Sequence, residues 1–167
     1  AHVLPDAGLK VDILLPDGRL VEGTSLGANR QRDIGLIKIN GPGPWPHVDR
    51  LGPSVPTPGQ WCVATGHPLG WRQAWPPALR LGRVLRGATD IITTDCVLAH
   101  GDSGGPLFDL AGNLIGVHSR IGRALASNVH TSIGVVRADW DRLLKGDVWG
   151  KPKQRAESRR SRNGHAP

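Results

Sequence analysis

The sequence lacks several residue types and patterns that would mark particular classes of protein. Its 167 residues include no methionine, no tyrosine, one phenylalanine and two cysteines. It has no run of about 18 apolar residues, which excludes a membrane-spanning helix. Its seven histidines and two cysteines lack the H-x-x-x-H and C-x-x-C spacings of metal sites. We therefore expect neither a metal nor any other cofactor.

The excess of positive charge is concentrated at the C-terminal end. The net charge is +7, and residues 150–167 carry +5 of it, from six basic side chains and one acidic side chain. This segment has almost no apolar residues, so we expect it to be disordered. The remaining body carries about +2, which gives no reason to expect specific nucleic-acid recognition. The tail could contact phosphates or anionic lipid through charge alone, but a solvated linker is the simpler interpretation.

The two cysteines allow two interpretations. Cys62 and Cys96 both lie in apolar, strand-like segments. They could form one disulfide in an exported protein, or they could be buried thiols that behave as small apolar residues. We favour buried thiols. Neither cysteine has a histidine and acid pattern of its own, which argues against a cysteine protease.

Short apolar runs alternate with turns throughout the body, as expected of an all-β protein. The chain has 23 glycines and 14 prolines, and runs such as Val11–Leu15 and Leu114–Val117 end at Gly, Pro, Asn or Asp. Many short strands with frequent turns favour barrels or a sandwich over βαβ units. The segment Ala138–Lys145 is the best helix candidate, because it has an apolar face and acidic residues near its start.

The hexapeptide Gly101–Pro106, G-D-S-G-G-P, is the most informative motif. Gly101 can adopt backbone angles that other residues avoid, so that the amides of Gly101 and Ser103 could point at one developing oxyanion. The pattern makes Ser103 a candidate nucleophile. An ordinary glycine-rich turn is the alternative interpretation.

A serine nucleophile needs a base and a group that orients the base. His2, in Ala1-His2-Val3, is the candidate base, and Asp33 precedes the apolar segment Ile34–Ile39, which we interpret as a buried strand opened by an acid. The other histidines lie beside proline, glycine or short apolar stretches, or in the charged tail. These three residues give the order His, Asp, Ser along the chain.

Four motifs together resemble the trypsin-like (chymotrypsin-fold) serine proteases, closest to their bacterial HtrA/Deg-type branch. The matching segments are Ala1–Val3 with the end of T-A-A-H-V, Asp33–Ile39 with the D-[IL]-A strand, Gly66–Gly70 with G-N-P-L-G, and Thr94–Leu107 with the serine motif. The resemblance extends from residue 1 to about residue 146. It implies a double β-barrel fold with an incomplete first barrel and a short C-terminal helix.

The resemblance also implies the roles of the site residues. Ser103 would attack a peptide carbonyl to form an acyl-enzyme, and His2 would take and return the proton. Asp33 would orient His2, and the amides of Gly101 and Ser103 would form the oxyanion hole. The substrates would be proteins or peptides.

The residues before the oxyanion glycine would line the pocket for the substrate side chain. They are Val97, Leu98, Ala99 and His100, and the opposite wall would come from His118, Ser119 and Arg120. An apolar residue, Val97, stands at the expected floor, so a buried Lys or Arg would be unpaired there. We therefore expect cleavage after small or aliphatic residues.

Asp102 departs from the HtrA-type pattern, in which asparagine is usual. Trypsin has an acid at this place and pairs it with a freshly cut N-terminus. No Ile-Val-Gly-Gly start is present here, so Asp102 needs another partner, for which Arg120 is a candidate.

We expect a peptidase domain over residues 1–146, with a partial first barrel and crossover over 1–52, a second barrel and helix over 53–146, and a basic disordered tail or linker over 147–167. Because His2 normally follows several strands, the chain is expected to be an N-terminally truncated fragment, weakly active or inactive when isolated. A further domain can follow the tail in such proteins. The resemblance favours a periplasmic or secreted location. A protease-fold module that binds peptides without cutting them is the alternative function.

Overall fold

The computed structural model describes residues 1–4, 6–72, 75–122 and 126–151. These ranges contain ten strands and one helix. The elements are β1 Lys10–Leu14, β2 Leu20–Asn29, β3 Ile34–Ile39, β4 Trp61–Gly66, β5 Ala78–Gly87, β6 Ile91–Thr94, β7 Pro106–Asp109, β8 Leu114–Arg120, β9 Asn128–Ser132, α1 Ile133–Leu144 and β10 Val148–Trp149. No helix in these ranges is long and apolar enough to cross a membrane.

The second half of the chain folds into a closed barrel of six strands in the order β4-β5-β6-β9-β8-β7. Neighbouring strands of the barrel run antiparallel. Alternation along the strands sends one side chain in two inward. The buried core holds Cys62, Ala64, Val84, Ile92, Cys96, Leu98, Leu107 and Ile115. Closure leaves this sheet without an exposed edge, and it therefore gives a rigid base for the loops that carry the hexapeptide.

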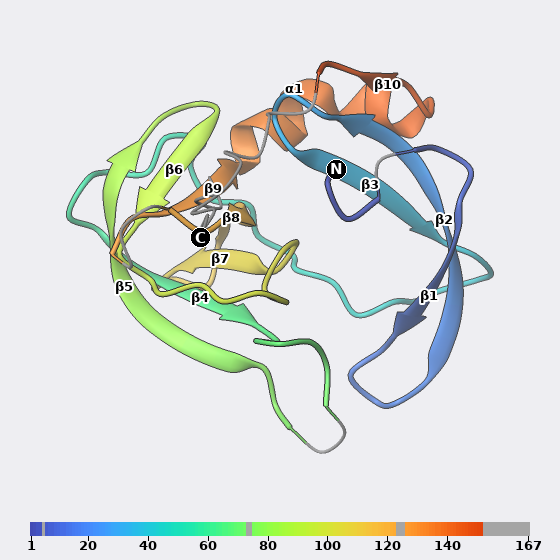
Figure 1. Ribbon diagram of the computed structural model, residues 1–167, viewed down its shortest axis with the longest axis horizontal. Helices are drawn as coiled ribbons and strands as arrows, with labels where there is room; N and C mark the ends of the chain where they lie inside the picture. Colours follow the sequence, from blue (N-terminus) through green and yellow to red (C-terminus); the bar gives the residue numbers. More distant parts are fainter. Residues whose placement is uncertain (5, 73–74, 123–125, 152–167) are drawn as a thin grey trace, which may run out of the picture.

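The first three strands and β10, from the C-terminal end, form a four-stranded sheet in which β1, β3 and β10 all pair with β2. Figure 1 shows this sheet beside the closed barrel, with α1 lying over one end of β2 and β3. The contact is close because Gly27 has no side chain, and a Cβ there would lie 2.6 Å from the Cα of Leu143. Ile34 of β3 packs with Val135 and Leu143 of the helix. The expected mostly β fold with two barrel-like halves is confirmed.

Two expected details were wrong. The helix starts at Ile133, five residues earlier than predicted, because the Ser132 hydroxyl caps it by accepting from the Gly134 amide, so its first turn holds no acid. Strand β3 is not a buried strand as a whole: Ile34 is buried, but Ile37 is 38% exposed. The helix covers one part of β3, and the rest borders a hollow.

The ordered chain continues beyond the predicted boundary at residue 146. Val148–Trp149 form β10, a parallel partner of β2, and the Trp149 ring lies 3.9 Å from the guanidinium of Arg142. Residues 148 and 149 therefore do not belong to a disordered tail. Residues 152–167, which carry nearly all of its basic charge, lie outside the described residues.

Candidate active site

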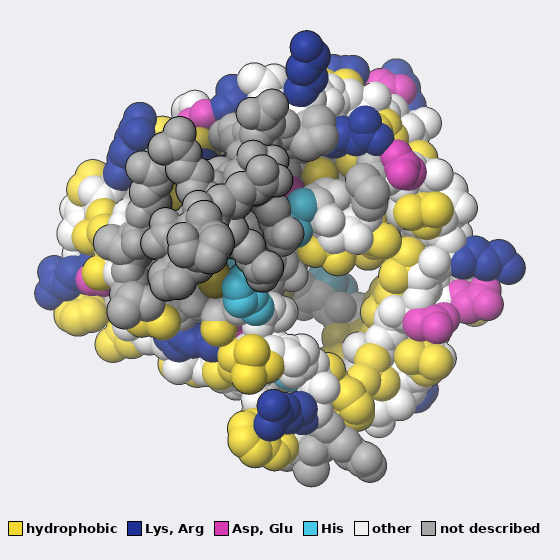
Figure 2. Space-filling model, in the orientation of Figure 1, with side chains coloured by type: hydrophobic (Ala, Val, Ile, Leu, Met, Phe, Trp, Pro, Cys, Tyr) yellow, Lys and Arg dark blue, Asp and Glu magenta, His cyan; other side chains and the backbone are white. Residues whose placement is uncertain are grey.

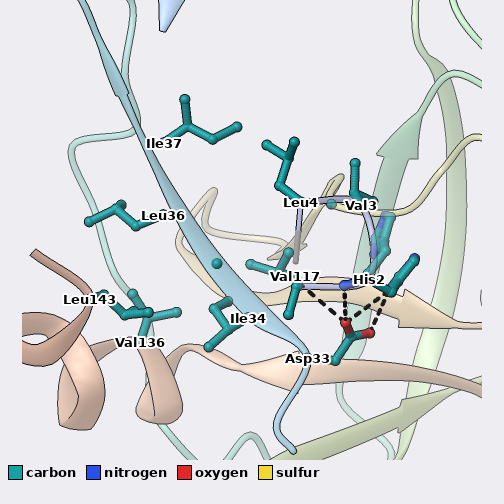
Figure 3. Close-up of a pocket in the computed structure, with 14 residues that line it drawn as sticks. His2, Val3, Leu4, Asp33, Ile34, Leu36, Ile37, Val117, Val136 and Leu143 are labelled. Atoms are coloured by element: carbon teal, nitrogen blue, oxygen red, sulfur yellow. Dashed lines mark hydrogen bonds and ion pairs between the residues drawn. The ribbon is translucent and has the colours of Figure 1, made fainter. Parts of the chain in front are cut away.

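His2 and Asp33 form a closely bonded pair at the edge of β3. The Nδ1 atom of His2 lies 2.8 Å from each carboxylate oxygen of Asp33, and the backbone amide of His2 donates to Asp33 Oδ1 at 2.9 Å. Figure 3 shows both groups and these contacts. A carboxylate can only accept, so Nδ1 donates, and in the neutral ring Nε2 keeps its lone pair. That is the tautomer a general base needs on its reactive side.

Asp33 occupies a conformation that few side chains adopt. Its φ is 58°, in the left-handed region, which aspartate tolerates better than most residues. Such strained backbone is often found at functional sites. The hydroxyl of Ser119, on β8, donates to Asp33 Oδ2 at 2.6 Å. Burial acts to raise the pKa of Asp33, but the hydrogen bonds from Ser119 and His2 outweigh it and lower that pKa.

The loop that carries Ser103 is held by backbone hydrogen bonds. The amide of Asp102 donates to Ala99, and those of Gly104 and Gly105 donate to His118 and Asp102. Gly101 has a φ of 101°, as the sequence required of it. Ser103 is exposed, and within the described part of the chain its hydroxyl makes no hydrogen bond to His2.

The turn Gly66–Gly70 packs against the loop that carries Ser103. The Leu69 amide donates to the His100 carbonyl at 2.5 Å, and Leu69 itself has a φ of 63°. A Cβ on Gly101 would lie 2.5 Å from both the Gly70 nitrogen and the His67 oxygen. The glycine is therefore required for close packing as well as for its backbone angles. Sequence reasoning found this turn by resemblance but did not find its contact with the loop.

A pocket of about 310 Å³ joins the two halves of the molecule. His2, Asp33 and Gly104 lie on its wall together with apolar side chains of β3, β8 and α1. The space-filling view shows a hollow between the halves, bordered by hydrophobic side chains (Figure 2). Gly104 follows Ser103, so the base and the nucleophile loop face the same hollow.

The remaining predicted pocket residues occupy different environments. Val97 is 51% exposed, whereas Leu98 is 6% exposed and belongs to the barrel core. The Ala99 amide donates to Asp102 Oδ2 at 2.7 Å. His100 and Arg120 are exposed. Ser119 was expected in the wall of the substrate pocket, and in the structure its hydroxyl donates to Asp33.

The partner of Asp102 is Arg80, not Arg120. The Arg80 Nη1 atom lies 3.2 Å from Asp102 Oδ2, and Asp102 is 1% exposed. The alternation along β5 did not reveal this partner. Leu79, Leu81 and Leu85 form the more apolar face of the strand, yet they are exposed, and the face with Arg80, Gly82 and Val84 points inward.

A second missed feature is a buried pair of histidines. The Nδ1 atoms of His118 and His130 lie 2.9 Å apart, His118 Nε2 lies 3.1 Å from the Thr65 carbonyl, and His130 Nε2 lies 2.8 Å from the Thr94 hydroxyl. Burial lowers the pKa of His118 to about 4 and that of His130 to about 3. Both rings are therefore neutral near pH 7. The sequence analysis placed His118 in the wall of the substrate pocket and set His130 aside because it has no metal spacing, whereas in the structure the two rings are buried against each other.

The cysteines are free and buried, as favoured from the sequence. Their sulfur atoms are 3.7 Å apart inside the barrel. Within the described part of the chain, no group of three or more His, Cys, Asp or Glu side chains is placed to hold a metal ion.

Comparison with known proteins agrees with this architecture. The model of the trypsin-like peptidase domain matches residues 1–117. The Do-like 14 protein of Arabidopsis thaliana is 36% identical over 65% of this chain and 27% of its own length. The periplasmic pH-dependent serine endoprotease DegQ of Escherichia coli is 29% identical over 87% of this chain and 35% of its own length. The serine endoprotease DegS of E. coli is 30% identical over 71% of this chain and 34% of its own length.

The chain thus spans about a third of the length of these relatives. Among solved structures, the HtrA-type protease AlgW with decapeptide superposes with a TM-score of 0.70 at 23% identity, over 83% of this chain and 45% of that chain. This likeness shows the fold. With the family model covering most of the chain, and HtrA/Deg-type proteases among its relatives, the protein belongs to the family of trypsin-like peptidase domains.

Proposed function

We propose that the chain carries the catalytic site of a serine endopeptidase, with Ser103 as nucleophile, His2 as general base and Asp33 as the group that orients the base. The observation that carries the proposal is the His2–Asp33 pair, which fixes the imidazole with Nδ1 toward the carboxylate. A neutral histidine held in this way can accept the serine proton through Nε2 and return it to the leaving amine.

The reaction would proceed through an acyl-enzyme. Ser103 Oγ adds to the peptide carbonyl while His2 takes its proton, and the amides of Gly101 and Ser103 stabilise the oxyanion. Collapse expels the amine, which takes the proton from His2, and water repeats the sequence to release the acid. Each oxyanion donor contributes about 3 kcal/mol to transition-state stabilisation in comparable enzymes.

The substrates would be proteins or peptides, cut after small or aliphatic residues. Val97 offers no charge, and the acids nearest to it in the sequence have other partners: Asp95 accepts from the Arg83 amide, and Asp102 pairs with Arg80. A substrate Lys or Arg would have no partner there. Hydrolysis of an Arg ester in preference to Val- and Ala-based esters would contradict this specificity. Because the relative DegQ is a periplasmic protease, we also propose a periplasmic or secreted location for this protein.

Labelling with a fluorophosphonate probe tests the catalytic proposal. We expect the probe to label the wild-type chain and not the Ser103→Ala variant. The Ser54→Ala variant is a matched control, because Ser54 contacts Arg137 and lies on the crossover away from the pocket. Equal labelling of Ser103→Ala and wild type would refute Ser103 as the nucleophile.

A peptide-binding module without cleavage is the second candidate. The observation that favours it is that, among the described residues, no hydrogen bond joins Ser103 to His2. Serine–histidine contacts are often loose before substrate binds, so this geometry alone does not decide. Saturable binding of a fluorescent apolar peptide without probe labelling or product would favour this module.

A further inference from the structure

Asp102 is a buried carboxylate in the middle of the nucleophile loop. Its side chain is 1% exposed, and the residues on either side are Gly101 and Ser103. One oxygen, Oδ2, accepts from the Ala99 amide at 2.7 Å. The other, Oδ1, is buried without a hydrogen-bond partner. Burial of a carboxylate is costly unless an opposite charge lies close.

Arg80 supplies that charge from the barrel interior. Its Nη1 lies 3.2 Å from Asp102 Oδ2, and its side chain is 19% exposed. The same Nη1 has no hydrogen-bond partner of good geometry. Arg80 and Asp102 are therefore held together by an ion pair and not by a hydrogen bond. No other described cation lies within ion-pair distance of Asp102.

The surrounding groups leave Asp102 little freedom to move. A Cβ on Gly66 would lie 2.4 Å from Asp102 Oδ1, so the carboxylate occupies a notch that only glycine leaves open. A Cβ on Gly105 would lie 3.0 Å from the Asp102 carbonyl oxygen. The amide of Asp102 in turn donates to Ala99. The position of the carboxylate therefore fixes the backbone from Ala99 to Ser103.

We propose that Arg80 is a positioning residue that holds the oxyanion loop in its active shape through its ion pair with the buried carboxylate of Asp102. Arg80 touches neither substrate nor Ser103 in this role. It fixes Asp102, which is covalently joined to Gly101 and Ser103, the two residues whose amides form the proposed oxyanion hole. The inference rests on the proposed endopeptidase function.

The test measures the rate of fluorophosphonate labelling in a double-mutant cycle. Arg80→Gln should slow labelling about 100-fold, the size of effect seen when an oxyanion donor is lost. In the Asp102→Asn background the same substitution should slow labelling less than about threefold, because no buried negative charge remains for Arg80 to hold. Arg80→Lys should restore part of the rate. Arg83→Gln, on the outward face of the same strand, should label like wild type.

Equal slowing by Arg80→Gln in both backgrounds would overturn the proposal, and so would wild-type labelling by a folded Arg80→Gln variant. If Arg80→Gln does not fold, the labelling rate of Arg80→Lys is compared with that of the Arg80→Lys, Asp102→Asn double variant instead. A structural role alone would lower the melting temperature without this dependence on the background.

Hydrogen–deuterium exchange separates this inference from the proposed function. The amides of Ala99 and Asp102 are bonded within the loop, and Arg80→Gln should make both exchange at least tenfold faster. If wild type is not labelled at all, the endopeptidase proposal fails, while the exchange rates still test the role of Arg80. Unchanged exchange at both amides would overturn that role.

Discussion

Acidification from pH 7.5 to 4.5 should destabilise the fold through the His118–His130 pair. The Thr65 carbonyl can only accept, so His118 Nε2 carries a proton and His118 Nδ1 accepts from His130 Nδ1. His130 Nε2 then accepts from the Thr94 hydroxyl. Each ring has its proton where a partner needs it, and neither has room for a second proton without losing a hydrogen bond.

The size of the effect follows from the lowered pKa values. Both histidines ordinarily titrate near 6.5, but their pKa values in the fold are about 4 and about 3. The unfolded chain therefore binds protons first as the pH falls. The stability due to the neutral rings is complete above pH 6.5 and is lost as the pH falls toward 4 and 3. At pH 4.5 each ring has lost about 2.5 kcal/mol, so that together they remove about 5 kcal/mol.

That loss is comparable with the whole stability of a small domain, about 5–15 kcal/mol. Nearby charges change it little, because Asp102 raises the pKa of His118 while Arg80 lowers it, and burial is the larger cause. Asp33, whose pKa is lowered from 3.8, loses its contribution only at a still lower pH. The contribution of the pair is therefore taken from the difference between the wild type and a variant that lacks one of the two rings.

Urea unfolding at the two pH values measures the free energy of unfolding directly. His130→Gln removes one titrating ring and should reduce the acid-induced loss by about 2–3 kcal/mol. His47→Gln is the matched control, because His47 is a surface side chain, 74% exposed. A wild-type loss below about 1 kcal/mol would refute the reasoning, as would equal losses in the two variants.

Three further predictions concern the loop, the thiols and the acid of the site. Gly101→Ala should abolish probe labelling and destabilise the fold more than Gly112→Ala, as measured by urea unfolding. Both residues have positive φ, which costs about 1–3 kcal/mol in a residue other than glycine, but only Gly101 also has backbone atoms at 2.5 Å from the new Cβ. Cys62 and Cys96 should react with a thiol reagent only after unfolding and then give two equivalents, whereas zero equivalents without reductant would indicate a disulfide. Ser119→Ala should slow labelling about tenfold and move its acid limb to higher pH, because the carboxylate that it contacts loses a donor that lowers its pKa; an unchanged pH profile would count against this.

The sequence predicted those parts of the site that depend on local chemistry. The glycines of the hexapeptide gave the positive φ of Gly101, and the acid before β3 gave Asp33. The pairing of His2 with Asp33 was implied by the family resemblance and not by local chemistry, and the two residues are hydrogen bonded in the fold. Such motifs are readable because the backbone conformation and the chemistry are both encoded within a few neighbouring residues.

Contacts between distant strands were not readable in the same way. Arg80 and Asp102 are joined across the barrel. Arg120 was the wrong candidate for Asp102 because its place in the expected pocket wall does not show which side chains face the barrel interior. His118 and His130 meet because β8 and β9 pair in a register that places them opposite each other. Register is a property of two strands together.

By itself, the sequence determined the fold class, the turns and the residue types of the candidate site, since alternation, glycine and proline act locally. Only the tertiary structure decided which buried charges and rings are neighbours. A closed barrel brings strands far apart in the chain within hydrogen-bond distance, and the cost of burying Asp102, His118 and His130 is offset there by partners that no local pattern reveals.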